Sequence, residues 1–281
     1  MNQPLPASAR EPWSAHAGGW SQLGSPLRPC PEDLQRFHQA WTDSLPAGLP
    51  QRRIDILSLG VTPEIALHPW ASETHITAID ASEEMIRQVW PGDSAERRVV
   101  HGDWLAMPFA DASFDLILND AGLLLMAGAE KLRAAANELR RVLRPTGRVI
   151  LRHFARPSSP EPLDALVRAV ADGKLRNFHE LKLRLLMVLE TEKPGAGIRL
   201  ADVYDCFNLL FADRAVLASR LGCDPRTVAT IDRYRGQDAR YTFHSLAEMA
   251  MAFHAFTLNL GPDGHYPAAE RCPVLAFTPK S

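Results

Sequence analysis

The sequence predicts an α/β fold: a doubly wound, mostly parallel, seven-stranded sheet of the Rossmann-like kind, with an all-helical insertion after the fifth strand. Short apolar, β-branched runs alternate with helical segments between residues 51 and 157. This alternation indicates parallel strands that are buried on both faces. At Pro157 the alternation ends, and helical periodicity takes over until about His244. Strand-like runs return near the carboxyl end, so we expect the chain to complete the same sheet there.

The elements divide the chain into three parts. Residues 1–50 form an N-terminal arm and helix, residues 51–157 and 245–281 form the Rossmann-like core, and residues 158–244 form the insertion. The arm contains Trp13 and Trp20, which we interpret as anchors onto the domain rather than as a lid. A proline and two acids open its helix at Pro31. The remaining expected elements are strands at 54–59, 76–80, 98–101, 114–119, 148–152, 256–260 and 273–278, and helices near 83–89, 129–143 and from Ser245.

The insertion shows two apolar stripes at helical spacing, one from Leu175 to Val188 and one from Leu200 to about Phe211. Asp224 followed by Pro225 begins a third helix by the cap-then-proline signal. Few strand signals occur in this region. Because loops at the carboxyl ends of the strands carry specificity, we expect the insertion to be an acceptor-binding cap.

The turn after the first strand is the most informative local feature. Asp80 ends the second strand, where an acid commonly accepts from the hydroxyl pair of a ribose. Gly60 is the only glycine of the first turn, which argues against the glycine-rich turn of a dinucleotide site. Thr62 can cap the next helix, and Glu64 lies in its first turn. A nucleoside with a cationic or zwitterionic tail therefore fits better than a pyrophosphate.

The composition narrows the classes of function. The chain has 281 residues with 31 basic and 33 acidic side chains, a net charge of −2, so no nucleic-acid partner is expected. Apolar runs are too short for a membrane span, and residues 1–12 do not resemble a secretory signal, so we expect a cytoplasmic protein. The four cysteines are scattered, which disfavours a disulfide framework and a metal site. The oligomeric state is left open.

Taken together, the motifs resemble those of class I S-adenosylmethionine-dependent methyltransferases over roughly residues 50–156 and 245–280. The first motif, Ile56 to Gly60, resembles the family's V-L-D-L-G. Asp80-Ala81-Ser82 with Met85 matches "D-x-S-x-x-M". Further matches are Gly102-Asp103-Trp104, the run from Met107 to Asp115, and Leu139 to Gly147 before the fifth strand.

The resemblance implies S-adenosylmethionine as the cofactor and a role for each matching residue. Gly60 should let the backbone pass the methionine end of the cofactor, and Asp80 should accept both ribose hydroxyls. Asp103 should accept from the adenine amino group, with Trp104 beside the ring. Asn119 and Asp120, at the tip of the fourth strand, should border the sulfonium. The implied cofactor-binding set is Ser58, Gly60, Thr62, Glu64, Asp80, Ala81, Met85, Gly102, Asp103, Trp104 and Asn119.

Two departures from the family pattern affect the methionine end. Ser58 stands where the family has an acid, and Thr62 to Glu64 replace the glycine-rich tail. A neutral serine cannot attract an ammonium group as a carboxylate would. We therefore hypothesise that Glu64 supplies that charge. The same departures support an alternative function, a cofactor-binding protein without methyl transfer that serves as a partner subunit or sensor.

Candidates for the acceptor side are less sharply defined. Asp120 is the best candidate for a catalytic base, because the tip of the fourth strand borders the methyl group in this family. Tyr234, Arg235 and Tyr241 belong to a polar and aromatic cluster in the insertion that could hold a small molecule bearing a carboxylate. The alternative interpretation of this cluster is a solvated hinge between helices. The predicted function is methyl transfer to a small-molecule acceptor.

Overall fold

The computed structural model describes residues 17–44, 53–71, 73–191 and 195–280. Seven strands form one sheet in the order β3-β2-β1-β4-β5-β9-β8. The first five strands of this sheet pair in parallel, and β9 pairs antiparallel with both β5 and β8. The strands are β1 (Ile54–Leu59), β2 (Thr74–Asp80), β3 (Arg97–His101), β4 (Phe114–Asp120), β5 (Leu143–Arg152), β8 (Phe256–Leu260) and β9 (Val274–Pro279).

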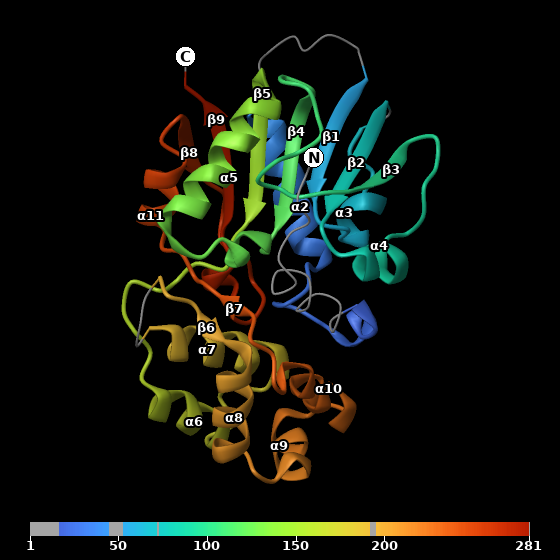
Figure 1. Cartoon of the computed structure of the whole chain (residues 1–281). Helices are drawn as coiled ribbons and strands as arrows, with labels where there is room; N and C mark the ends of the chain where they lie inside the picture. The colour runs from blue at the N-terminus through green and yellow to red at the C-terminus, as the bar shows by residue number, and fades with distance from the viewer. Residues whose placement is uncertain (1–16, 45–52, 72, 192–194, 281) are drawn as a thin grey trace.

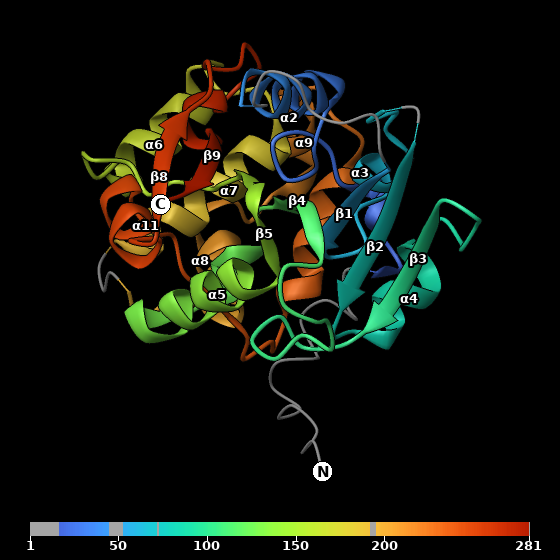
Figure 2. The same ribbon diagram turned by 90° about the horizontal axis from the view of Figure 1, so that it is seen from above.

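Helices cover both faces of the sheet, as Figure 2 shows from above. Alternate strand residues point to opposite faces, so each face builds its own apolar cluster. On one face, α5 (Gly128–Val142) and α11 (Leu246–Ala252) pack against residues such as Leu57 and Ile117. On the other face, α2 (Pro31–Asp43) and α3 (Pro63–Leu67) pack against residues such as Ile56 and Leu118. The predicted doubly wound sheet is confirmed.

The cap-like insertion lies beyond the carboxyl ends of the parallel strands, in the lower half of Figure 1. Its elements are α6 (Leu163–Ala171), α7 (Phe178–Glu190), β6 (Ile198–Arg199), α8 (Leu200–Leu210), α9 (Arg214–Leu221), α10 (Pro225–Ala229), η4 (Thr230–Tyr234) and β7 (Arg240–Tyr241). Strands β6 and β7 form a separate antiparallel pair. As expected, the described part of this region is mostly helical and contains few strand residues. The short β6–β7 pair was not predicted.

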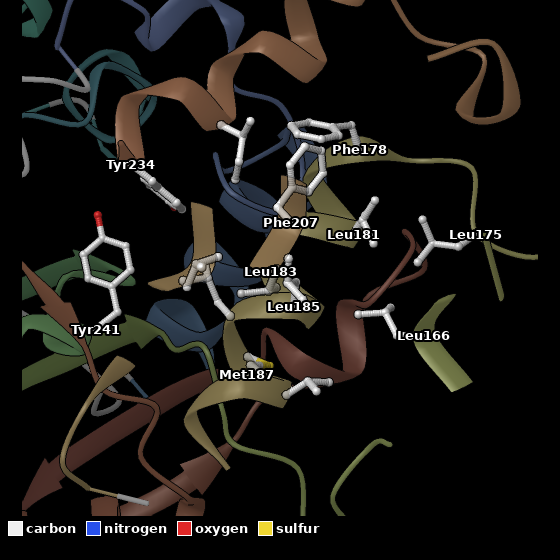
Figure 3. Packing of buried hydrophobic residues seen from close by; sticks show 14 of the residues in the cluster. Leu166, Leu175, Phe178, Leu181, Leu183, Leu185, Met187, Phe207, Tyr234 and Tyr241 are labelled. Carbon is white, nitrogen blue, oxygen red and sulfur yellow. The ribbon is translucent and has the colours of Figure 1, made fainter. Parts of the chain in front are cut away.

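The insertion joins the core at two adjacent points. The Arg156 N–H donates to the His244 carbonyl at 3.2 Å, so the chain leaves and re-enters the core side by side. Within the insertion, one large apolar cluster extends from Leu166 through Phe178 and Phe207 to Tyr241 (Figure 3). The same cluster includes Ala121 and other residues near the tips of β4 and β5, so the insertion is packed onto the carboxyl edge of the sheet.

The N-terminal segment lies across this junction. Ala17 packs against α4 (Glu83–Val89) of the core, with Trp20 beside it. Farther along, the Pro26 carbonyl accepts from the Arg152 guanidinium at 2.8 Å, and the Ser25 carbonyl accepts from Asn177 of α7 at 2.9 Å. Trp20 thus serves as an anchor, whereas Trp13 lies outside the described residues. No helix in the described part of the chain is long and apolar enough to cross a membrane.

Candidate functional site

The turn after β1 brings backbone close to the predicted cofactor position. Gly60 has φ of +94°, a conformation that side-chain-bearing residues rarely adopt, and its N–H donates to the Ile79 carbonyl at 2.9 Å. The Ser58 hydroxyl, only 1% exposed, donates to the Gly60 carbonyl at 3.0 Å. Ser58 therefore closes the turn through its side chain instead of presenting a group to solvent.

Asp80 lies at the carboxyl end of β2, beside this turn. Its carboxylate is nearly buried, and one oxygen accepts from the Ser82 N–H at 2.8 Å. Burial raises the pKa of Asp80 to about 6, although backbone N–H donors from Ser82, Val61 and Ala81 oppose the shift. A carboxylate that is buried, hydrogen-bonded to backbone and not paired with a cation is suited to accept from neutral hydroxyls.

The segment after β3 lies beside the Gly60 turn and Asp80. The Trp104 indole N–H donates to the Ile79 carbonyl at 2.8 Å, so the ring lies near Gly60 and Asp80. Asp103 accepts from the Leu105 N–H at 2.9 Å, which fixes its carboxylate at the start of the loop. The Gly102 N–H donates to the Asp80 carbonyl at 3.0 Å. Met85, on α4, is buried beneath the same corner.

Asn119 ties the tips of β1 and β4 together. Its amide donates to the Leu59 carbonyl at 2.9 Å and accepts from the Gly122 N–H at the same distance. A Cβ at Gly122 would lie 2.6 Å from both the Asn119 amide nitrogen and the Trp104 ring, so only glycine fits there. The structure thus brings Gly60, Asp80, Trp104 and Asn119 together at one edge of the sheet.

Glu64, in the first turn of α3, is paired with Arg28 of the N-terminal segment. The second carboxylate oxygen of Glu64 is buried and has no hydrogen-bond partner among the described residues. Arg28 also lies over the Trp20 ring, 5.6 Å from its centroid. The two charged residues border an open pocket of about 440 Å³, which is lined mostly by residues of the N-terminal segment. Thr62 occupies the N-cap position of α3, but its side chain makes no capping hydrogen bond, so the predicted cap is wrong in that respect.

Asp120 is engaged by a neighbouring cation. Its carboxylate is nearly fully buried and pairs with the Arg152 guanidinium, which also approaches Asp33 of α2 at 3.4 Å. Burial raises the pKa of Asp120, and the charge of Arg152 opposes that shift. Tyr266 donates to Asp33 at 2.7 Å and completes the cluster. The base role of Asp120 stays a prediction, and the ion pair with Arg152 would have to open before Asp120 could take a proton.

The three predicted acceptor residues separate into two groups. Tyr234 and Tyr241 are buried, with ring centroids 6.4 Å apart, at one edge of the insertion's apolar cluster (Figure 3). Arg235 is exposed, and its guanidinium bonds to the Tyr204 hydroxyl at 2.9 Å. The interpretation of the whole cluster as a solvated hinge is therefore wrong for both tyrosines. Residues that the sequence did not single out include Arg28, Arg152 and Lys182, because their partners lie far away along the chain.

Comparison with known proteins identifies the core. The family model described as "Methyltransferase domain" matches residues 57–151. Within the core, residues 57–151 therefore resemble a class I methyltransferase domain. This match covers β1 to β5 and includes the turn at Gly60, Asp80 and Asn119, so the resemblance seen in the sequence is confirmed.

Several proteins that are similar to this chain in sequence are also named methyltransferases. A demethylmenaquinone methyltransferase from Clavibacter sepedonicus is 33% identical over 150 residues, covering 50% of this chain and 58% of that protein. A malonyl-[acyl-carrier protein] O-methyltransferase from Enterobacter lignolyticus is 33% identical over 121 residues, covering 42% and 47%. The ubiquinone/menaquinone C-methyltransferase UbiE of Dinoroseobacter shibae is 31% identical over 135 residues, covering 44% and 52%. The chain spans about half the length of these relatives.

Solved structures resemble the methyltransferase fold over nearly the whole chain. A DhpI–SAM–HEP complex has a TM-score of 0.51 at 14% identity, covering 99% of this chain and 98% of that one. A Rhodobacter sphaeroides protein, provisionally named a Zn-dependent alcohol dehydrogenase, has a TM-score of 0.53 at 14% identity, covering 95% and 98%. At such identities the likeness shows the fold alone.

Proposed function

We propose that this protein is an S-adenosylmethionine-dependent methyltransferase that acts on a small-molecule acceptor held between the sheet edge and the helical insertion. The observation that carries the proposal is the buried carboxylate of Asp80 beside the Gly60 turn, which forms no ion pair among the described residues and lies within residues that match a methyltransferase domain. A ribose hydroxyl pair would add donors to those that the backbone already gives this carboxylate.

The charges around Glu64 suit the other end of the cofactor. The methionine tail carries one ammonium and one carboxylate. Glu64 has a buried oxygen without a partner, which an ammonium would satisfy, and Arg28 can offer its guanidinium to a carboxylate. The existing pair between Glu64 and Arg28 would open to admit the zwitterion. In this arrangement Glu64 attracts the ammonium group, which in the family is the role of the acid at the position of Ser58.

When bound, the cofactor supplies a methyl group on a sulfonium, which moves to the acceptor as the acceptor's proton leaves to solvent or a nearby base. The protein's part is alignment and exclusion of water. Asn119 holds the tips of β1 and β4 at a fixed separation, and Trp104 and Gly122 form a tight wall beside it. The insertion would cover this edge and help to exclude water from it.

The relatives named above act on quinone precursors and on a malonyl group carried by a protein, and they include both C- and O-methyltransferases. A small acceptor is consistent with these names. We favour it over a nucleic-acid acceptor because the net charge of −2 provides no general attraction for nucleic acid.

The proposal is tested by calorimetric titration of the protein with S-adenosylmethionine and S-adenosylhomocysteine. We expect binding in the micromolar range for the wild type and its loss in Asp80→Ala. Asp205→Ala, at an exposed position of α8, is the matched control and should bind as the wild type does. Absence of binding in the wild type would refute the proposal. Binding without turnover across an acceptor screen would instead favour the non-catalytic cofactor-binding protein.

A further inference from the structure

Lys182 is a buried lysine whose ammonium has no anionic partner. The side chain lies on α7 and is 1% exposed. Its Nζ contacts the Thr230 carbonyl at 3.4 Å and lies 4.2 Å from the centroid of the Tyr234 ring. It forms no ion pair with any carboxylate in the described ranges. A buried cation without a counter-ion is costly, so its position needs an explanation.

The charged group that acts on Lys182 is another cation, Arg233: burial and this nearby charge lower the pKa of Lys182 to about 7. His179, one turn earlier on α7, has its pKa lowered to about 4 by burial and by the charge of Lys182, so its ring is neutral near pH 7. The buried Nδ1 of His179 has no hydrogen-bond partner among the described residues. These groups together form a place where one negative charge would be stabilised.

An aromatic wall connects this place to the methyltransferase edge. Tyr234 packs edge-on against Tyr241, and both rings lie together at one side of the cluster in Figure 3. Directly after Tyr241, the Thr242 N–H donates to the Leu124 carbonyl at 2.8 Å, in the turn that follows β4. The tyrosines therefore run from Lys182 toward the strand tip that carries Asn119.

The N-terminal segment covers the same place. The Gln22 side chain accepts from Arg233 at 3.2 Å, and a Cβ at Gly24 would lie 3.0 Å from the His179 ring. A small ligand could reach Lys182 when this segment moves, without unfolding of the helices beneath it.

We propose that Lys182 binds a carboxylate of the acceptor, whose apolar or aromatic body lies against Tyr234 and Tyr241. This inference rests on the proposed function, because it assigns the substrate class to the same site. It predicts an acceptor that carries one anionic group at the end away from the methylated atom.

The test uses benzoate as the probe and benzamide as its uncharged match, with thermal unfolding of the full chain as the readout. We expect about 20 mM benzoate to raise the unfolding midpoint of the wild type by a few degrees, as for a ligand of about millimolar affinity, and benzamide to have little effect. Lys182→Met should fold, because an apolar side chain suits the site, and should lose the response to benzoate. Lys174→Met, at an exposed lysine, should keep the response.

Equal effects of benzoate and benzamide on the wild type would overturn the proposal, and this comparison needs no variant. An unchanged benzoate response in Lys182→Met would overturn it as well, since Lys182 would then be a neutral amine packed on Tyr234. S-adenosylhomocysteine is titrated in parallel. If it binds while benzoate fails, only the acceptor subsite is refuted, whereas failure of S-adenosylhomocysteine in the wild type refutes the methyltransferase proposal.

Discussion

The proposed role of Asp80 in cofactor binding predicts that cofactor affinity depends on pH. Burial raises its pKa from 3.8 to about 6. This shift means that the folded, ligand-free protein disfavours the ionised form by about 3 kcal/mol, at 1.36 kcal/mol for each pH unit. Because the pKa of the folded state is raised, this group favours the folded state most at low pH, and that stability is lost as pH rises from about 4 to 6.

Ribose hydroxyls that donate to Asp80 would bind its ionised form. Between pH 7 and pH 5 the ionised fraction falls from about nine-tenths to about one-tenth, so the dissociation constant for S-adenosylhomocysteine should rise about tenfold. The variant Asp80→Asn removes the titration. It should bind more weakly than the wild type at pH 7 and show no comparable change between pH 7 and pH 5. The ligand-free variant should unfold at a higher temperature at pH 7, because it no longer buries a charge.

Calorimetric titrations at pH 5, 6 and 7 measure the affinities, and repeating them in buffers of different ionisation enthalpy counts the protons released on binding. A wild-type affinity that stays level from pH 7 to pH 5 would refute the reasoning. So would a tenfold change that persists in Asp80→Asn, because another group would then be responsible.

Four further substitutions test neighbouring features. Glu64→Gln should weaken cofactor binding in calorimetry by about tenfold or more, and Ser58→Ala by much less; equal small losses would contradict the assignment of charge to Glu64. Gly122→Ala should destabilise the protein by about 1–3 kcal/mol in denaturant unfolding, because its Cβ would overlap the Asn119 amide and the Trp104 ring; unchanged stability would mean that this wall is loosely packed. Arg152→Met should cost about 3–5 kcal/mol by the same measurement, because buried Asp120 loses its cation and buried Asp33 keeps only its pair with Arg36; a cost below about 1 kcal/mol would show that Asp120 is protonated or solvated.

Local signals in the sequence predicted most of the core. The predicted helix from Ser245 is present, and it begins with reciprocal hydrogen bonds between Ser245 and Glu248. The acid at the end of β2 and the lone glycine after β1 predicted the cofactor edge, because both are set by backbone geometry within a few residues.

Features that depend on tertiary contacts were not predicted. The β6–β7 pair has two residues in each strand, which is too short for any periodicity to appear. Arg28 and Glu64 meet across 36 positions, and Lys182 is buried only because helices from distant parts of the insertion surround it. Thr62 is a different case. The local signal for a helix cap correctly predicted that Thr62 is the N-cap of α3, but the Thr62 side chain does not make the capping hydrogen bond.

The hydrogen bond between Arg156 and His244 has a consequence for how such proteins diversify. The 87 residues between these two positions leave the core and return to it at neighbouring points. Removing them would therefore leave the strand order of the seven-stranded sheet unchanged. Loops of this kind can be replaced at little entropic cost beyond that of closing them. An exchanged insertion would need only to match the apolar patch around Ala121 and Phe154 on the core. Under the proposed function, replacement of this unit would change the acceptor while the cofactor edge stays as it is.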